Sequence, residues 1–218
     1  MQMKICFLYS FKGVQMMFES QPVDREIVLK TADDLLKTGR TKEVTIVDEL
    51  GQEWTLKEFK KLNEKLDEEP EKVTVLFDGS YDVDSSRAGV GTAIYYSKGG
   101  KRYRLRENVP LDALQSNNEA EYAALSFAVG KLEELGVISQ PVTISGDSLT
   151  VLNQLSGEWP CYEENHARWL VRIEEKLNKL RIKPLYKPID RRHNKEADQL
   201  ARQALEGVEI QSHAEIGT

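Results

Sequence analysis

The sequence has 218 residues, of which 40% are hydrophobic and 30% are charged, and its formal net charge is -6 at pH 7. This length suits one large domain or two small ones with a genuine core. The negative balance excludes a broad basic surface, so any nucleic acid would be bound through a local site or through metal ions.

No stretch approaches the roughly 20 apolar residues that cross a bilayer, so no membrane partner is expected. The apolar opening at 1–11 lacks a small-residue cleavage pattern and is interpreted as a strand, not as a signal peptide. The two cysteines, Cys6 and Cys161, and three histidines form neither a disulfide framework nor a zinc pattern. A reducing, cytoplasmic setting is therefore expected.

The first 70 residues are expected to form a small α+β accessory domain. In chain order, the pattern predicts strands at 4–11 and 14–20, a helix at 24–39, a hairpin at 42–55 and a helix at 56–69. Thr55 and Glu58 have the spacing of a capping box at the start of the second helix. The charged segment around Pro70 predicts a boundary between a domain at 1–70 and a second unit from residue 73.

The second unit, 73–206, is expected to be an α/β domain followed by a loose tail at 207–218. The predicted elements are strands at 73–80, 88–97 and 101–109, a helix at 117–136, a strand at 141–147, helices at 148–157 and 163–180, a last strand at 181–189 and a helix at 194–207. Three strands in a row followed by alternating helices and strands predict a mixed sheet with helices on its faces. Prolines in the last strand favour an edge position, and Asn194 is expected to cap the last helix.

Four acidic residues stand where apolar side chains would be expected. Asp78 and Asp147 each end an apolar strand. Glu121 lies on the same helical face as the apolar residues of its helix, and Asp198 is in line with the apolar side of the last helix. The sequence therefore predicts carboxylates directed at one sheet from two strands and two helices.

Each of these residues also has an ordinary explanation. Asp78 could simply start a turn, and Asp147 or Ser148 could cap the helix that follows. Asp198 could offset the dipole of the last helix. Glu119, by contrast, aligns with the solvent-facing side of its helix and is interpreted as a solvated residue.

Clustered carboxylates repel one another and raise each other's pKa values unless a cation neutralises them. Ligation by oxygen alone, without histidine or cysteine, favours Mg²⁺ or Mn²⁺ over zinc. Two such ions can activate water and stabilise the leaving oxygen in phosphodiester hydrolysis.

The four carboxylates stand in the motifs FDGS, NNEAEY, SGDS and NKEADQLA, in that order. This series resembles type 1 ribonuclease H, and is most similar to its reverse-transcriptase-like branch in bacilli and their relatives. The resemblance covers about residues 73–206. It implies a five-stranded mixed sheet flanked by helices, and hydrolysis of the RNA strand of RNA–DNA hybrids with two Mg²⁺ or Mn²⁺ ions.

Carried over by position, the resemblance implies one role for each carboxylate. Asp78 would bridge both ions, and Asp147 would hold the ion on the nucleophile side. Glu121, which follows the Asn-Asn pair by three residues, would hold the ion on the leaving side and help to position the attacking water. Asp198 would complete the site in the most mobile role.

The resemblance also implies substrate contacts. Asn117 and Asn118 would meet the hybrid in its minor groove, where shape and 2′-hydroxyls are read instead of sequence. Gly79 and Ser80 would approach the RNA strand closely, so a bulky residue at 79 would block it. Ser148 is included among the expected substrate-binding residues.

Two features depart from the family pattern. Instead of the family's histidine in a mobile loop ahead of the last helix, this sequence has His193 directly before the helix. His193 is kept as a candidate substrate contact, or it is simply an exposed residue. In the second case Arg191 or Arg192 could contact the leaving phosphate. The segment at 157–168 is acidic and aromatic where the family often has basic residues. A strand carrying three arginines could compensate, or could be an ordinary solvated face: Arg102, Arg104 and Arg106.

Two other functions stay open beside the nuclease. The fold could bind nucleic acid or a protein with little turnover, or the amino-terminal domain could carry a regulatory role. Residues 1–72 hold 12 Lys+Arg against 15 Asp+Glu, so this domain is a poor phosphate binder. It is expected to pack on the nuclease domain or to bind a protein partner.

Overall fold

The structure is a computed structural model that describes residues 2–39 and 41–217. The chain divides into two compact units, Met1–Glu68 and Glu69–Thr218. No helix in these described residues combines the length and apolar character that a membrane crossing requires.

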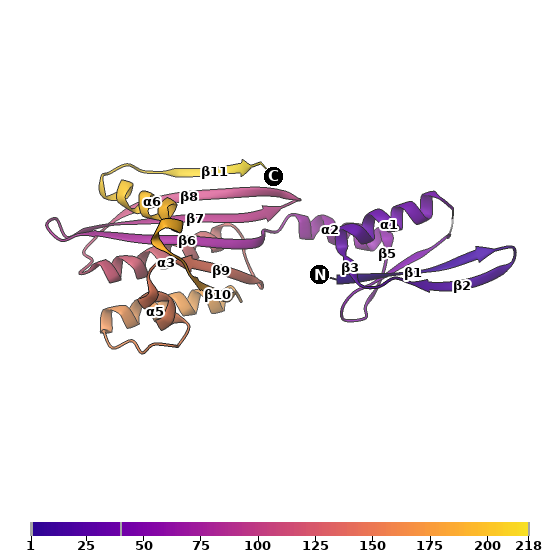
Figure 1. The fold of residues 1–218 in the computed structure, drawn as a ribbon, viewed down its shortest axis with the longest axis horizontal. Coiled ribbons are helices and arrows are strands. Elements are labelled where there is room, and N and C mark those ends of the chain that lie inside the picture. The colour runs from indigo at the N-terminus through magenta and orange to yellow at the C-terminus, as the bar shows by residue number, and fades with distance from the viewer. Residues whose placement is uncertain (1, 40, 218) are drawn as a thin grey trace. The chain divides into compact units, whose positions relative to one another are not determined.

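The first unit is a sheet covered by two helices (Figure 1). Its strands run in the order β2-β1-β4-β5, with β3 paired to β1. The elements are β1 (Gln2–Phe11), β2 (Val14–Glu19), β3 (Val23–Asp24), α1 (Arg25–Lys37), β4 (Val44–Val47), β5 (Glu53–Thr55) and α2 (Leu56–Asp67). Its core is small and apolar: Met3, Ile5, Val28, Ala32, Val44, Ile46 and Phe59.

The predicted elements of this unit are confirmed, including the hairpin that becomes β4 and β5. The capping box at the start of α2 is confirmed as well. A carboxylate oxygen of Glu58 accepts a hydrogen bond of 3.0 Å from the backbone N–H of Thr55, and the Thr55 hydroxyl accepts one of 3.2 Å from the N–H of Glu58. These bonds satisfy donors that the first turn of a helix otherwise leaves free.

The second unit is a mixed sheet with the strand order β10-β9-β6-β7-β8-β11 (Figure 1). β7 is antiparallel to its neighbours β6 and β8, whereas β9 and β10 run parallel to β6. The elements are β6 (Glu71–Asp82), β7 (Arg87–Lys98), β8 (Lys101–Asp112), α3 (Asn117–Glu134), β9 (Pro141–Gly146), α4 (Leu149–Leu155), α5 (Glu164–Lys179), β10 (Lys183–Pro188), the 3₁₀ helix η1 (Arg191–His193), α6 (Lys195–Leu205) and β11 (Gln211–Ile216). The predicted α/β class and the edge position of the proline-containing strand β10 are confirmed.

The predicted count of five strands and the loose tail at 207–218 are wrong. Residues of that tail form β11, which pairs antiparallel with β8 from Gln211↔Glu107 to Ile216↔Arg102. The buried side chain of Asn108 holds the segment that leads into β11. Its amide donates to the carbonyl oxygen of Val208 at 3.0 Å and its oxygen accepts from the N–H of Ile210 at 2.6 Å.

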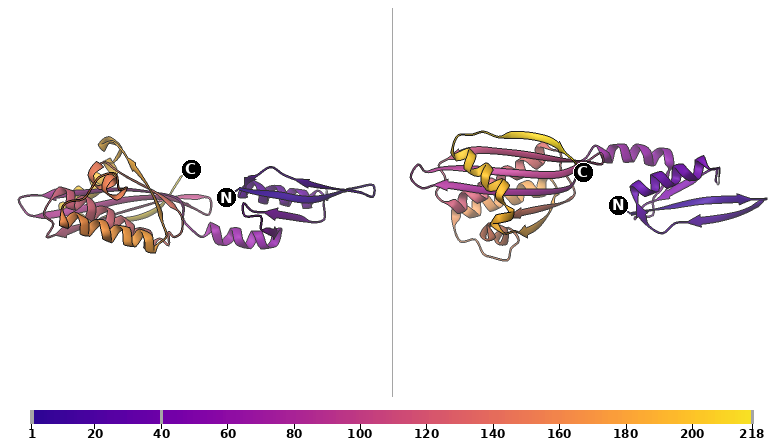
Figure 2. Two further views of the ribbon diagram at one scale, coloured as in Figure 1. Left: turned by 90° about the horizontal axis from the view of Figure 1, so that it is seen from below. Right: turned by 45° about the horizontal axis from the view of Figure 1, so that its top comes forward.

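Helices cover both faces of this sheet (Figure 2). Gly79 of β6 faces α3, and a Cβ atom there would collide with the backbone of Ala120. Gly91 of β7 is the cross-strand partner of Asp78 and faces α6, where a Cβ atom would lie 2.6 Å from the backbone nitrogen of Ala201. The two glycines therefore let α3 and α6 lie directly on the sheet beside Asp78.

Candidate active site

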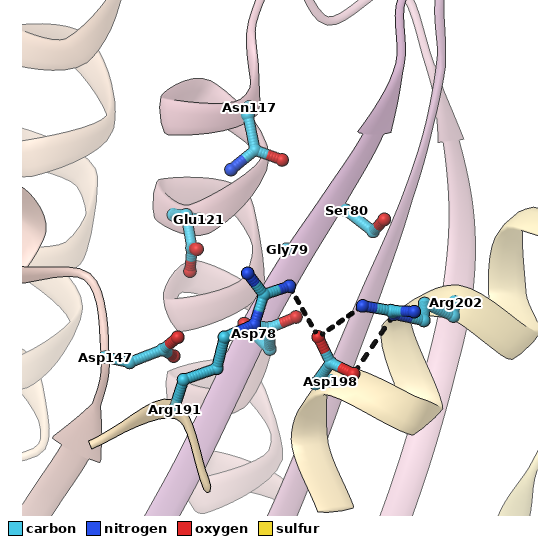
Figure 3. A pocket seen from close by; sticks show the side chains of 9 residues that line it. All are labelled: Asp78, Gly79, Ser80, Asn117, Glu121, Asp147, Arg191, Asp198 and Arg202. Carbon is cyan, nitrogen blue, oxygen red and sulfur yellow. Dashed lines mark hydrogen bonds and ion pairs between the residues drawn. The ribbon is translucent and has the colours of Figure 1, made fainter. Parts of the chain in front are cut away.

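A polar pocket of about 270 Å³ lies where four elements of the second unit meet (Figure 3). Each element brings one carboxylate: β6 carries Asp78, α3 carries Glu121, the residue after β9 is Asp147, and α6 carries Asp198. The other lining residues are Gly79, Ser80, Asn117, Arg191 and Arg202. The structure therefore brings together the four carboxylates that the sequence singled out.

The pairing of β6 with β9 places Asp78 and Asp147 at the same level of the sheet. The two strands are parallel, and the last paired position is Leu76 with Ser145. Asp78 and Asp147 each follow two residues later. The expectation that Asp78 ends its strand is wrong, because β6 continues to Asp82, with Asp78 paired to Gly91 of β7.

Glu121 points inward from the second turn of α3, as its helical face predicted. Its side chain is buried, and its Oε2 atom has no hydrogen-bond partner. The interpretation of Glu119 as a solvated residue is wrong. Glu119 is equally buried, and its two oxygens accept hydrogen bonds from the Trp169 indole at 3.1 Å and from the backbone N–H of Gln115 at 2.8 Å. A partner on α5 explains this burial, and the helical pattern alone gives no sign of it.

Two arginines hold Asp198. Arg202, one turn later on α6, contacts both carboxylate oxygens, with Nε 3.1 Å from Oδ2 and Nη2 3.2 Å from Oδ1. Arg191 of η1 donates to Oδ1 from Nη2 at 3.1 Å (Figure 3). The pocket therefore contains two guanidinium groups as well as four carboxylates. Arg191 was predicted from the sequence as a site residue, whereas Arg202 was not.

Asn194, which the sequence predicted as the cap of the last helix, instead contacts one of the four carboxylates. It occupies the N-cap position of α6, but its side chain makes no capping hydrogen bond. Its fully buried amide instead donates to the carbonyl oxygen of Phe77 at 2.9 Å and to Oδ1 of Asp147 at 2.6 Å. Asn194 thus orients one site carboxylate, and nothing local in the sequence distinguishes this arrangement from a cap.

Burial and crowding raise the pKa values of two carboxyl groups. Burial, followed by the charges of Asp147 and Asp198, raises the pKa of Asp78 to about 7, and the nearby arginines offset part of this. Burial, followed by the charges of Asp78 and Asp147, raises the pKa of Glu121 to about 9. Asp78 and Glu121 can therefore both be ionised near neutral pH only if a positive charge lies close to them.

The lining residues fit a hard divalent cation. The candidate ligands are all carboxylate oxygens, the donor type that Mg²⁺ and Mn²⁺ prefer. The unpartnered Oε2 of Glu121 is an acceptor available to such an ion. Within the described part of the chain, no group of three or more acidic, histidine or cysteine side chains is already arranged to hold a metal ion. The arginines on Asp198 occupy oxygens that a cation would need.

The other predicted site residues divide into two groups. Gly79, Ser80, Asn117 and Arg191 line the pocket, whereas Asn118, Ser148 and His193 do not. The His193 side chain is 66% exposed, and its Nδ1 atom lies 3.9 Å from Asp190.

The basic strand and the aromatic segment lie outside the pocket lining. Arg104 and Arg106 form ion pairs with Glu196 of α6 at 3.2 and 3.1 Å, so they are not a free phosphate-binding face. Trp159 and Tyr162 are both exposed, which leaves their ring faces accessible.

This sheet order, the helices on both faces and the four carboxylates in one pocket define a ribonuclease H-like protein. The family model described as "Reverse transcriptase-like" matches residues 76–204, and the chain belongs to this family. A curated relative, "Uncharacterized protein YpeP" of Bacillus subtilis (strain 168), is 50% identical over 175 residues, which cover 80% of this chain and 77% of the relative.

Solved structures agree with this assignment. RNase H1 from the halophilic archaeon Halobacterium salinarum NRC-1 is 29% identical, with a TM-score of 0.55, and the match covers 62% of this chain and 98% of that one. LC11-RNase H1, solved in complex with an RNA/DNA hybrid, is 24% identical, with a TM-score of 0.56 and the same two coverages, and shows the shared fold. The resemblance to type 1 ribonuclease H is confirmed.

Proposed function

We propose that this protein is a divalent-metal-dependent endoribonuclease that hydrolyses the RNA strand of RNA–DNA hybrids. The observation that carries the proposal is the convergence of Asp78, Glu121, Asp147 and Asp198 in one pocket from four separate elements. Their fit to Mg²⁺ or Mn²⁺ and the ribonuclease H-like fold support it. When bound, two such ions supply charge neutralisation and an activated water for phosphodiester hydrolysis.

The chain's own residues have distinct tasks in this proposal. Asp78 lies within the influence of the charges of Asp147 and Asp198, and these three carboxylates would hold the ions together. Glu121, buried on the α3 side with an unpartnered Oε2 atom, would hold one ion and help to position a water. Arg191 and Arg202 offer guanidinium groups at the mouth of the pocket, where they can donate to phosphate oxygens.

The proposed substrate is a hybrid duplex, and the ribonuclease H-like fold and the uncharged polar residues of the pocket lining support this choice. Asn117, exposed at the start of α3, and Ser80, on β6, are the uncharged polar residues of the lining. They are placed to contact 2′-hydroxyls and base edges of an A-like minor groove. The RNA/DNA hybrid bound by LC11-RNase H1 is in line with this choice.

The test is cleavage of an end-labelled RNA–DNA hybrid in Mg²⁺ and separately in Mn²⁺. Wild-type protein is expected to cut the RNA strand, and Asp78→Asn to be inactive while keeping its fold by circular dichroism. The matched control is Asp112→Asn, an exposed aspartate of β8 outside the pocket, which should retain full activity. Cleavage by Asp78→Asn at the wild-type rate would contradict the proposal.

A binding module with little turnover is the second candidate. It is favoured by the two arginines that occupy Asp198, and by the exposed acidic residues Glu158, Glu163 and Glu164 in the segment before and at the start of α5. A hybrid titration with and without Mg²⁺ separates the candidates. Affinity without any hydrolysis supports the binding module, and the absence of affinity removes it.

A further inference from the structure

The hairpin of β1 and β2 carries apolar side chains that the nuclease proposal does not use. All six residues of β2 are exposed, and the hairpin runs past the helices of its own unit (Figure 1 and Figure 2). The exposed large apolar side chains of this hairpin are Leu8, Phe11, Val14, Met16, Met17 and Phe18. A cluster of this kind is typical of an interaction surface.

The pairing of β1 with β2 assigns these side chains to faces. Phe7, Tyr9 and Phe11 lie opposite Phe18, Met16 and Val14, on the face where the helices cover Met3 and Ile5. The Phe7 and Phe18 rings stack with centroids 5.4 Å apart. The apolar face of the sheet therefore continues beyond its helices as an aromatic and methionine-containing strip.

β2 is also an open edge of its sheet. It pairs with β1 on one side and ends the strand order on the other, so its outward backbone N–H and C=O groups have no strand beside them within the described chain. Edge strands are usually protected by proline, by bulges or by charged side chains. Between Val14 and Phe18, β2 has none of these, and its first charged residue is Glu19, at its end.

The sequence of β2 is complementary to itself in the antiparallel direction. If two copies pair about Met16, Met16 faces its own counterpart and Val14 faces Phe18 on the apolar face, while Gln15 faces Met17 on the other. Glu19, which forms an ion pair with Lys4 of its own chain at 2.5 Å, then lies opposite Gly13 of the second copy at each end of the pairing. Shifting the pairing to centre on Met17 would lose the contact between Val14 and Phe18.

We propose that β2 is the interface of a homodimer, in which two copies of the chain pair antiparallel through their β2 strands across a two-fold axis at Met16. An interface on a two-fold axis must be self-complementary, and the apolar pairs of β2 meet this requirement. The pairing satisfies the open backbone groups and places Val14, Met16 and Phe18 beside the same side chains of the second copy. This gives the amino-terminal unit an assembly role, which is separate from the hydrolytic pocket.

The first experiment measures mass by light scattering across a concentration series of the full chain. The wild type is expected to approach twice the chain mass of 24.9 kDa. Met16→Lys places two ammonium groups opposite each other at the two-fold axis, so it should give single chains, whereas Met16→Leu should remain dimeric. Monomeric wild type, which would leave the edge to a strand of another protein, overturns the proposal, as does a Met16→Lys variant that remains dimeric.

The second experiment tests the register by oxidation. In a background without Cys6 and Cys161, Met16→Cys should form a disulfide-linked dimer readily, because directly opposed Cβ atoms lie about 4.5–5.5 Å apart in antiparallel strands. Met17→Cys should link several-fold less, since its counterpart lies diagonally at about 7–8 Å. The reverse order of the two rates would rule out the pairing centred on Met16. Unchanged circular dichroism and urea denaturation would show that both variants are folded.

Discussion

Asn194 donates a hydrogen bond of 2.6 Å to Asp147 across 47 residues of sequence. The same amide donates to the carbonyl oxygen of Phe77, the residue before Asp78. One buried side chain at the start of α6 therefore fixes the orientation of a carboxylate after β9 relative to β6. Partners of this kind set the geometry and basicity of metal ligands.

Asn194→Ala is expected to lower Mn²⁺ affinity and hybrid hydrolysis by about 10–100-fold, as the loss of such an orienting partner typically does. Calorimetric Mn²⁺ titration and cleavage rates measure the two effects. The control is Asn63→Ala, which removes an asparagine side-chain hydrogen bond to Asp67 within α2 of the first unit, outside the pocket lining. It should lower the free energy of unfolding and leave Mn²⁺ affinity unchanged. Equal Mn²⁺ affinity in both variants would argue against the orienting role of Asn194.

The stability of the protein in a metal chelator is expected to fall as the pH rises from about 4 to about 9. The folded state keeps protons on Asp78, with a pKa of about 7, and Glu121, with a pKa of about 9, that the unfolded chain has already released. The folded state binds more protons in this window, so each rise in pH favours unfolding. Urea denaturation at a series of pH values measures the slope.

Two substitutions and one ligand test the source of this slope. Glu121→Gln should flatten it over the whole range up to about pH 9, and Asp78→Asn only below about pH 7, while Asp112→Asn should leave it unchanged. Mg²⁺ should restore stability at alkaline pH, since a cation that binds only the folded state stabilises it. If the stability of the double variant, Asp78→Asn with Glu121→Gln, still fell as the pH rises, other groups would be responsible for the slope.

Arg202→Ala is expected to raise the affinity for Mn²⁺ and to lower the affinity for an RNA–DNA hybrid. Arg202 and a cation compete for the oxygens of Asp198, so its removal should tighten Mn²⁺ binding by up to about fivefold, because an exposed ion pair contributes about 1 kcal/mol at most. Hybrid affinity without divalent cations should fall, because a phosphate-binding group is lost. Arg168→Ala removes a similar exposed pair with Glu164, outside the pocket, and should change neither.

Gly91→Ala is expected to destabilise the fold by about 1–3 kcal/mol and to reduce hydrolysis, because the added Cβ pushes α6, and with it Asp198, away from the sheet. Gly130→Ala is the matched control, since its Cβ would meet only the flexible end of Lys176 at 3.4 Å. It should raise the free energy of unfolding by about 0.5–1 kcal/mol, through helix propensity. Urea denaturation of the two variants should therefore give shifts of opposite sign.

Local patterns predicted most of the elements and the carboxylate cluster. The inward direction of Glu121 follows from its helical face alone, and Asp147 from the end of an apolar strand. What escaped prediction depends on partners distant in sequence. Glu119 is buried because it accepts a hydrogen bond from the indole of Trp169, which lies 50 residues further along the chain.

The same cause explains the other errors. β11 is polar and has no strand pattern of its own, and it forms because β8 offers an edge and Asn108 ties down the segment before it. Asn194 and Arg202 have ordinary helix positions in the sequence, and their roles arise only when α6 packs on the sheet. Residue spacing encodes which face a side chain occupies, but not which group it meets there.

The bond between Asn194 and Phe77 spans 117 residues, and contacts of such separation form slowly because a long loop must close first. During synthesis, β6, α3 and β9 emerge from the ribosome well before α6. A nascent chain of that length already exposes an unfinished sheet edge at β8, and it holds three of the four carboxylates without Asn194 to orient them. We expect such a chain to depend on chaperones and to be inert toward hybrids until α6 docks.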